Sequence, residues 1–246
     1  MPPLFVDGVE INSLFVDGVE QNSMFVDGVQ VFSAEQLQFM FDDFNGSPNG
    51  TLVGNHISNT GQGWEAAEFD QGSVIRTSVG GQGLGLLGTT SQSCDIQPLF
   101  DTDLTGFYCK VLLSLASTGL NLSNCRIYVG YRTLDAANST YVRYAQQSGL
   151  LQLTNNELDL GLTTHPNTAS RLIELECWWD GTDLQGRVTV NGQSVTTPRL
   201  AMIDVLNPYN GRTYNNENIA PGSNDAEPNV YEYTLQEYAP EDVPFP

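Results

Sequence analysis

Residues 171–180 read Arg-Leu-Ile-Glu-Leu-Glu-Cys-Trp-Trp-Asp, and their alternating character decides the fold class. Successive side chains of a β-strand point to opposite faces of its sheet. One face of this stretch therefore carries only apolar groups: Ile173, Leu175, Cys177 and Trp179. Two acids and an indole alternate with them on the other face. The stretch predicts a strand with one buried face and one face turned towards solvent.

The same alternation of apolar and polar residues is found on both sides of this strand in the sequence. Asp180-Gly181-Thr182-Asp183 turns the chain into a second strand, Gln185–Val190, and Asn191-Gly192 turns it again. Asn-Gly between β-formers is a strong hairpin signal, because Gly adopts positive φ at little cost. Further strands are predicted at Phe107–Leu115, Arg126–Arg132, Thr140–Ala145 and Val230–Tyr238. Helical periodicity is almost absent after Phe41, so the pattern indicates an all-β sandwich over residues 41–238.

Residues 1–33 contain three ten-residue β-turn repeats, each with Phe-Val before an Asp-Gly pair and Val after it. Asp-Gly between β-formers favours a type I′ turn, so each repeat is predicted to be a short hairpin. Such a unit is too small to bury its own Phe and needs neighbours to share a core. We therefore interpret the segment as an anchor or oligomerisation element. Its assembly residues are Phe5, Val6, Val9, Phe15, Val16, Val19, Phe25, Val26 and Val29.

The remaining segments are read as connections. Residues 34–40 are predicted to be a linker, with a short helical turn over Ser33–Met40 capped by Ser33. The glycine-dense stretch Gly80–Gly88 predicts a strand formed by Leu84, Leu86 and Leu87, in which glycine lets another backbone come close. Asn207–Asn229 is rich in Asn, Pro and Gly and is read as a long structureless insertion. Residues 239–246 form an acidic, proline-rich tail in this interpretation.

The charge is strongly one-sided, with 29 acids, 9 bases and a formal net charge of −20. Such a chain repels phosphate backbones and anionic membranes, so nucleic-acid binding is not expected. A signal peptide is not expected, because the start of the sequence has no basic segment followed by an apolar run. Membrane insertion is not expected either, because no apolar run is long enough. We expect assembly in the cytoplasm of a host cell. The four cysteines are scattered, and buried free thiols are favoured over disulfides in that compartment.

Several stretches resemble the concanavalin A-like and laminin-G-like β-sandwich modules of tailed-phage virion proteins. They are Asp42-Asp43-Phe44-Asn45-Gly46, Gly61-Gln62-Gly63-Trp64-Glu65, Trp178-Trp179-Asp180-Gly181-Thr182 and Val188-Thr189-Val190-Asn191-Gly192. The Phe-Val-Asp-Gly-Val repeats are similar to short repeats of phage structural proteins. The resemblance covers about residues 40–238 and implies a concanavalin A-like jelly-roll, with the strand Tyr231–Tyr233 beside Phe41–Phe44. This fold hosts lectins, glycosidases and structural modules, so the resemblance alone does not decide function.

The outward positions of the predicted strands gather bases, acids and aromatics. If these strands share one sheet, their outer face suits sugar stacking, bidentate hydrogen bonds or a protein partner. The alternative is an ordinary solvated face with cross-strand ion pairs. The residues of this face are Lys110, Arg126, Tyr128, Arg132, Tyr141, Arg143, Glu174, Glu176 and Trp178.

Catalytic and metal chemistry have weaker support. Glycosidases of the resembled fold carry Glu-x-Asp-x-x-Glu on one strand, whereas here Glu174 and Glu176 are followed by Trp179 at the third position, so we expect no catalysis. Asp42, Asp43 and Asn45 could supply oxygen ligands to calcium, but an Asx turn leading into Gly46 is the favoured explanation. No other cofactor is expected. Neither His56 nor His165 has a partner pattern, and both are predicted to be surface loop residues.

The resulting functional hypothesis is a phage virion structural protein, either a capsid decoration protein or a fibre, anchored by its repeats and displaying a lectin-like sandwich. The alternative is a carbohydrate-binding adhesin or receptor-binding protein of the tail, and a glycoside hydrolase is the third possibility. The expected partners are other virion proteins and surface glycans. Because the repeats cannot fold alone, we also expect a homo-oligomer, with a trimer as the specific expectation.

Overall fold

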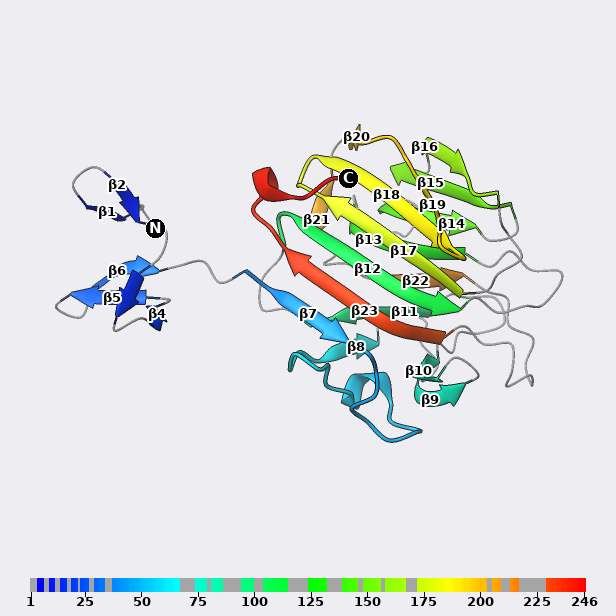
Figure 1. The fold of residues 1–246 in the computed structure, drawn as a ribbon, viewed down its shortest axis with the longest axis horizontal. Helices are drawn as coiled ribbons and strands as arrows, with labels where there is room; N and C mark the ends of the chain where they lie inside the picture. Colours follow the sequence, from blue (N-terminus) through cyan, green and yellow to red (C-terminus); the bar gives the residue numbers. More distant parts are fainter. Residues whose placement is uncertain are drawn as a thin grey trace. The chain divides into compact units, whose positions relative to one another are not determined.

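The structure is a computed structural model that describes residues 4–6, 9–11, 14–16, 19–21, 23–26, 29–33, 37–66, 74–78, 81–85, 94–99, 104–114, 124–131, 139–145, 148–155, 158–166, 172–202, 205–208, 213–216 and 229–246. Over these residues the chain forms strands and two short 3-10 helices, with no α-helix (Figure 1). The all-β prediction is therefore confirmed. None of the described residues belongs to a helix that is long and apolar enough to cross a membrane.

The chain divides into two compact units, Met1–Gln38 and Phe39–Pro246. In the first unit each repeat holds one antiparallel strand pair. The pairs are β1 (Leu4–Val6) with β2 (Val9–Ile11), β3 (Leu14–Val16) with β4 (Val19–Gln21), and β5 (Ser23–Val26) with β6 (Val29–Ser33). Val6 pairs with Val9, so two residues separate the strands, as a two-residue hairpin requires. The predicted type I′ geometry of the Asp-Gly pairs and the side chains of the nine assembly residues lie outside the described residues.

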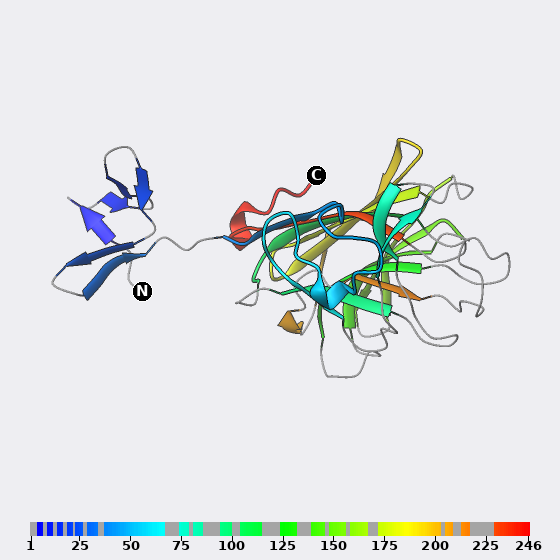
Figure 2. The ribbon, with the colours of Figure 1, turned by 90° about the horizontal axis from the view of Figure 1, so that it is seen from below.

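The second unit contains two antiparallel sheets stacked on each other (Figures 1 and 2). The nine-stranded sheet has the order β19-β18-β17-β12-β23-β10-β9, with β20 on β18 and β7 on β23. Its strands are β7 (Phe39–Asp42), β9 (Val74–Ser78), β10 (Gly81–Gly85), β12 (Phe107–Ser114), β17 (Leu172–Trp179), β18 (Asp183–Val190), β19 (Gln193–Thr196), β20 (Leu200–Ala201) and β23 (Asn229–Glu237). The predicted return of the closing strand is confirmed, because Tyr233 pairs with Asp42 and Thr234 with Phe41.

The eight-stranded sheet has the order β16-β15-β14-β13-β22-β11-β8, with β21 on β13. Its strands are β8 (Trp64–Ala66), β11 (Cys94–Pro98), β13 (Asn124–Tyr131), β14 (Ser139–Ala145), β15 (Leu150–Asn155), β16 (Leu158–Thr164), β21 (Leu206–Pro208) and β22 (Thr213–Asn216). The 3-10 helices are η1 (Val53–Asn55) and η3 (Pro240–Asp242). Residues 206–208 and 213–216 thus belong to the sheet, so the predicted structureless insertion over Asn207–Asn229 is wrong at these positions.

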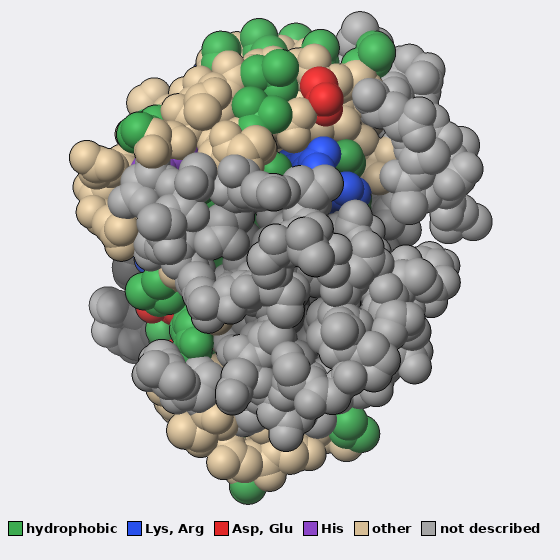
Figure 3. Space-filling model, turned by 90° about the vertical axis from the view of Figure 1, so that its right-hand side faces the viewer, with side chains coloured by type: hydrophobic (Ala, Val, Ile, Leu, Met, Phe, Trp, Pro, Cys, Tyr) green, Lys and Arg blue, Asp and Glu red, His purple; other side chains and the backbone are tan. Residues whose placement is uncertain are grey.

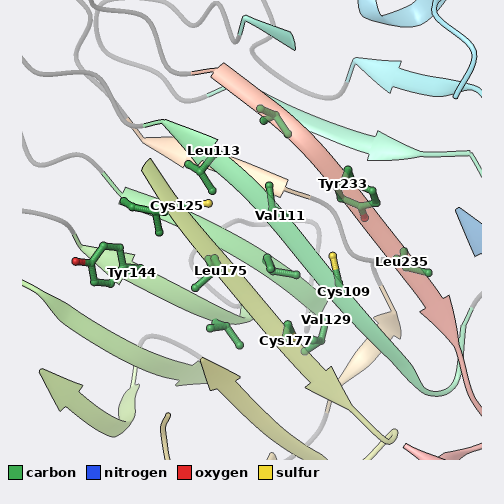
Figure 4. Close-up of a cluster of buried hydrophobic side chains, with 14 of the residues drawn as sticks. Cys109, Val111, Leu113, Cys125, Val129, Tyr144, Leu175, Cys177, Tyr233 and Leu235 are labelled. Carbon is green, nitrogen blue, oxygen red and sulfur yellow. The ribbon is translucent and has the colours of Figure 1, made fainter. Parts of the chain in front are cut away.

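The core lies between the sheets and follows the predicted alternation. Cys109, Val111, Leu175 and Cys177 point inwards from the nine-stranded sheet and are completely buried, as Figure 4 shows. Cys109, Cys125 and Cys177 are free thiols, in agreement with the prediction of buried free cysteines; the side chain of Cys94 lies outside the described residues. The sheets approach closely at Gly186, where an added Cβ would lie 2.5 Å from Cγ1 of Val142 on the opposite sheet. Glycine is therefore required at this contact.

Two connections differ from their predictions. Ser33 ends β6, and Phe39 and Met40 begin β7, so the predicted helical turn over Ser33–Met40 is wrong at these three residues. Phe39–Asp42 becomes a strand because it pairs with β23, a partner distant in sequence that local patterns do not reveal. The segment 239–246 is also not a free tail. It forms η3 and buries Val243, whose side chain packs against Gly106.

Candidate ligand-binding face

The predicted face is divided between two sheets, which is a correction to the sequence-based interpretation. Lys110 on β12 and Glu174, Glu176 and Trp178 on β17 lie on the outer face of the nine-stranded sheet, in the register given by the strand pairing. Four other members lie on the outer face of the eight-stranded sheet: Arg126, Tyr128, Tyr141 and Arg143. Arg132 lies outside the described residues. Alternation assigns a side chain to a face of its strand, but it does not tell which strands pair.

On the nine-stranded sheet, Glu176 is the centre of a closed hydrogen-bond network. Arg187 donates from Nε and Nη2 to the two carboxylate oxygens at 2.5 and 2.6 Å, and the Tyr108 hydroxyl donates at 2.7 Å. Hydrogen bonding to Glu176 raises the pKa of Arg187, and burial together with Glu176 raises the pKa of Tyr108. The Glu176 side chain is only 2% exposed, so this predicted outward residue is not available to solvent.

The neighbouring charges on this sheet also neutralise each other. Lys110 Nζ lies 3.2 Å from Glu232 and 3.6 Å from Glu174. Burial opposes the charge of Lys110, but the two carboxylates outweigh burial and raise its pKa. Trp178 is covered to 4% exposure, with Arg187 over its ring at 5.0 Å. These contacts match the alternative weighed for this face, a set of cross-strand ion pairs, more closely than an open binding site.

The outer face of the eight-stranded sheet is chemically different. Its pairing places Arg126 beside Arg143 and Tyr128 beside Tyr141, and β15 continues the two rows with Gln152 and Thr154. The Arg126 guanidinium lies 4.7 Å from the centre of the Tyr141 ring and donates to the Tyr128 hydroxyl at 3.3 Å. The two tyrosine rings are 5.2 Å apart. Rings, guanidinium groups, an amide and a hydroxyl therefore share one surface, which is the residue set that polar ring ligands require.

Accessibility is uneven along these rows. Tyr128 is 1% exposed and Tyr141 9%, whereas Arg126 and Arg143 are partly exposed and Asp159 of β16 is exposed. We infer that Tyr128 orients Arg126, and that the partly exposed guanidinium groups of Arg126 and Arg143 are the parts that a ligand could reach. Basic side chains are visible beside hydrophobic and acidic ones at the end of the molecule shown in Figure 3.

Sequence reasoning missed five participants in the two faces: Tyr108, Arg187, Gln152, Thr154 and Asp159. Arg187 could have been found, because the Asp180–Asp183 hairpin places it directly opposite Glu176. Gln152 and Thr154 belong to a strand that was not predicted, since Leu150–Asn155 alternates only weakly. Asp159 belongs to β16, which pairs with β15, so it could not be placed without predicting β15 first. It pairs with Thr154, whose hydroxyl lies 3.4 Å from the Asp159 carboxylate.

The residues suggested as calcium ligands have other partners. Asp42 is fully buried, and its Oδ1 accepts the Phe44 amide at 2.8 Å. Its Oδ2 accepts the Trp64 indole at 2.6 Å and lies 2.8 Å from His56 Nε2. The Asp43 carboxylate accepts the Asn45 amide at 3.0 Å, which is the Asx turn weighed as the alternative. Burial would raise the pKa of Asp43, but hydrogen bonds from Asn45 and Asn59 lower it. Within the described ranges no group of three His, Cys, Asp or Glu side chains could hold a metal ion.

Both histidines are buried, so their prediction as surface loop residues is wrong. His56 is 1% exposed and joins Asp42 to the Ser47 hydroxyl, 2.8 Å from its Nδ1. His165 is also 1% exposed, with Nε2 2.9 Å from the Gln193 carbonyl oxygen. The Ser47–His56–Asp42 chain links the loop after β7 to that strand. The His56 ring also packs against Phe44, which in turn packs against Trp64.

Neither a family model nor a curated protein matches this sequence. Solved structures do match the fold. A protein of unknown function from Shewanella oneidensis MR-1 has a TM-score of 0.53 and 10% identity over 82% of this chain and 87% of that chain. The exoplasmic/lumenal domain of VIP36 in its Ca2+/Man-bound form has a TM-score of 0.51 and 11% identity over 82% and 92% of the two chains. At these identities the likeness establishes a lectin-like β-sandwich fold, in agreement with the sequence prediction, and nothing beyond the fold.

Proposed function

We propose that this protein is a virion component that binds carbohydrate through the outer face of its eight-stranded sheet. The observation that carries the binding part is the paired row of Arg126, Tyr128, Tyr141 and Arg143. Guanidinium groups donate several hydrogen bonds to ring hydroxyls, and tyrosine offers an apolar ring with a polar tip. VIP36, which shares the fold, has been crystallised with Ca2+ and Man, and this supports a sugar as the ligand class.

A glycan array tests the binding part directly. Wild type should bind a limited set of glycans, and Arg143→Ala should reduce that signal by about tenfold or more, as the loss of one charge-assisted contact implies. Lys110→Ala is the matched control, because it removes one positive charge from the opposite sheet and should leave the signal unchanged. Absence of any signal from correctly folded wild type would refute carbohydrate binding.

The virion part rests on the N-terminal unit. Its three strand pairs form separate two-stranded sheets, and an isolated pair of three-residue strands is marginal in water. Such units become stable only when other protein surfaces cover their apolar residues. A capsid, a tail or identical copies of the chain could supply those surfaces. We propose that the repeats tether the sandwich to a particle built in the host cytoplasm, with other virion proteins as partners.

Quantitative mass spectrometry of purified particles tests this second part. A protein present in many copies would be a capsid decoration protein, and a protein present in few copies would belong to the tail and act as an adhesin. Absence from purified particles would exclude both assignments without affecting the carbohydrate result. Glycoside hydrolysis is the least favoured function. Turnover of a polysaccharide panel by wild type would be the evidence for it.

A further inference from the structure

The C-terminal segment crosses one end of the nine-stranded sheet on its outer side (Figures 1 and 2). It leaves β23 at Tyr238, whose amide donates to the Gly106 carbonyl oxygen at 3.0 Å. Val243 is 8% exposed, and an added Cβ on Gly106 would lie 3.2 Å from its Cγ2. The segment is thus attached where β12 begins, although it carries three prolines and two exposed acids.

The far end of the segment is held by a cation. The Arg199 guanidinium lies 3.8 Å from the centre of the Phe245 ring. Arg199 is itself fixed by Asp180 at 2.6 Å and Asp183 at 2.7 Å, which belong to the turn between β17 and β18. Residues 240–246 therefore span the adjoining ends of β12, β17 and β18, anchored by one small buried side chain and one cation–π contact.

Aromatic and amide groups lie on the outer face at these strand ends. Tyr108, Trp178 and Gln185 are direct cross-strand neighbours, and the Tyr108 and Trp178 ring centres are 5.2 Å apart. An indole that faces outwards from a two-layer sandwich is normally accessible, yet Trp178 is 4% exposed and Gln185 8%. Arg187 and Tyr108 cover part of the indole, and the C-terminal segment is the described chain that passes over this end.

The side-chain amide of Gln185 has an oxygen that could accept a hydrogen bond from a ligand. Its Nε2 donates to the Thr197 carbonyl oxygen at 2.9 Å, which fixes the orientation of the amide because the reverse would place two oxygens together. Its Oε1 is buried and accepts no hydrogen bond from the residues that the structure describes. A buried acceptor of this kind is unfavourable unless a donor reaches it.

We propose that residues 240–246 form a displaceable strap over a second carbohydrate-binding platform, made by Tyr108, Trp178 and Gln185. The Tyr108 ring and the part of the Trp178 indole that Arg187 leaves uncovered would pack against the apolar face of a hexose, and a ring hydroxyl would donate to Gln185 Oε1. The ligand is an uncharged glycan, because Glu176 lies beside the platform and the chain has a net charge of −20. This platform is independent of the binding face proposed on the opposite sheet.

The test uses the full chain carrying Arg143→Ala, which silences the other proposed face. The strap is weakened by Phe245→Ala in one variant and removed by ending the chain after Ala239 in another. Phe39→Ala is the matched control, since this ring lies on the same sheet and is 42% exposed. Acrylamide quenching of tryptophan fluorescence reports uncovering of Trp178, and calorimetry with maltohexaose and cellohexaose reports binding.

We expect both strap variants to show increased quenching and at least about tenfold tighter binding of one of the two probes than the control. Adding Trp178→Ala to the shortened chain should abolish both effects. Unchanged quenching in the Phe245→Ala protein, which should fold normally, would show that the segment does not cover the indole and would overturn the proposal. Increased quenching without binding of either probe, or binding that survives Trp178→Ala, would also overturn it. None of these outcomes depends on the result of the glycan array, because every protein compared here already carries Arg143→Ala.

Discussion

At the scale of single residues, the outer face of the nine-stranded sheet contains two glutamates with very different surroundings. Glu176 is 2% exposed and bound by Arg187 and Tyr108, whereas Glu174 is 33% exposed and lies 3.6 Å from Lys110. Glu176→Ala leaves a guanidinium and a phenol without their acceptor, so we expect the free energy of unfolding to fall by about 3 kcal/mol. Because Arg187 stays partly exposed, water limits the loss to the lower end of the usual range.

Glu174→Ala is the matched control for this prediction. An exposed ion pair contributes about 0–1 kcal/mol, so its removal should have little effect. Urea unfolding of both variants, compared at the transition midpoint, measures the difference. Equal losses for the two variants would mean that burial of the Glu176 network has no energetic consequence.

The buried thiols give a pH dependence of known sign. Burial raises the pKa of Cys109 from 9.0 to about 12, and it also raises the pKa of Cys125 and Cys177. The unfolded chain releases these protons near pH 9 while the folded protein keeps them. Stability is therefore fully present below about pH 9 and is lost as the pH rises towards the folded pKa of Cys109, by about 1.4 kcal/mol per pH unit for each thiol.

Urea unfolding at a series of alkaline pH values checks this expectation. Cys109→Ala should lower stability at neutral pH through its cavity, but it should also flatten the alkaline slope by the contribution of one thiol. An identical slope in wild type and variant would show that Cys109 does not stay protonated in the folded protein.

Single-residue predictions from sequence succeeded where alternation was sufficient and failed where a distant partner decides. The inward positions of Cys109, Val111 and Leu175 follow from a period of two. His56 was placed on the surface because its partner, the Asp42 carboxylate, is fourteen residues away and becomes a neighbour only through folding. The same reason applies to Asp42 as a weak calcium candidate, since Trp64 and His56 share its Oδ2 and the Phe44 amide binds its Oδ1.

At the scale of elements, β7 shows how an edge strand is protected. Its outer edge is covered by side chains of the loop that follows η1. Thr60 Oγ1 accepts the Phe41 amide at 3.0 Å, Asn59 Oδ1 accepts the Asp43 amide at 3.1 Å, and Gln62 Nε2 donates to the Phe39 carbonyl oxygen at 2.9 Å. Exposed edge strands pair with other chains, and side chains that occupy their backbone groups prevent this.

Removing two of these caps should therefore have two effects. In the double variant Asn59→Ala/Thr60→Ala we expect a loss of about 1–2 kcal/mol in the free energy of unfolding, because the freed amides can still reach water. We also expect concentration-dependent association, visible by light scattering. Thr182→Ala, in an exposed turn elsewhere, is the control and should remain within about 0.5 kcal/mol of wild type. Association in the control as well would rule out edge protection as the cause.

Elements were predicted well from local signals, but their pairing was predicted only in part. The return of β23 beside β7 followed from the family resemblance, whereas the division of the other strands between two sheets was missed. Asn191 and Gly192 both have positive φ, as the Asn-Gly signal requires, and Gly83 lies where an added Cβ would be 2.7 Å from the Val230 carbonyl oxygen. Leu84, Leu86 and Leu87 were expected to form that strand, and only Leu84 lies within the described residues. The division of the predicted face arose because β12 pairs with β17 while β13 pairs with β14, and alternation is the same in both sheets.

At the scale of the whole molecule, the two outer sheet faces differ in how they use charge. On the nine-stranded sheet, every described base of the central strands faces an acid at ion-pair distance, as with Lys110 and Arg187. On the eight-stranded sheet, Arg126 stacks on the Tyr141 ring and pairs across the strands with Arg143. In a chain with a net charge of −20, this second arrangement concentrates cationic hydrogen-bond donors on one surface. The grouping of guanidinium groups with tyrosine rings, rather than the fold, is the reason for proposing carbohydrate recognition on this face.

The N-terminal unit leads to the last prediction, which concerns assembly. Each hairpin has only two strands, and the hairpins belong to three separate sheets, so their apolar residues need cover from other copies or from a particle. We expect the full chain to form a homo-oligomer, specifically a trimer. A chain that starts at Phe39, the first residue of the second unit, should be a monomer with an unchanged unfolding temperature, because the sandwich has its own core.

Light scattering and thermal unfolding of the two chains measure these quantities. The triple variant Phe5→Ser/Phe15→Ser/Phe25→Ser is the matched control within the full-length chain: it keeps the length and charge of the repeats and removes only their rings. If those rings are what copies share, this variant should also be monomeric, since burying a Phe contributes about 1.5–3 kcal/mol and each copy would lose three such contacts. Monomers throughout, including wild type, would contradict self-assembly and leave attachment to a particle as the remaining role for the repeats. An oligomer that persists without residues 1–38 would instead place the interface on the sandwich.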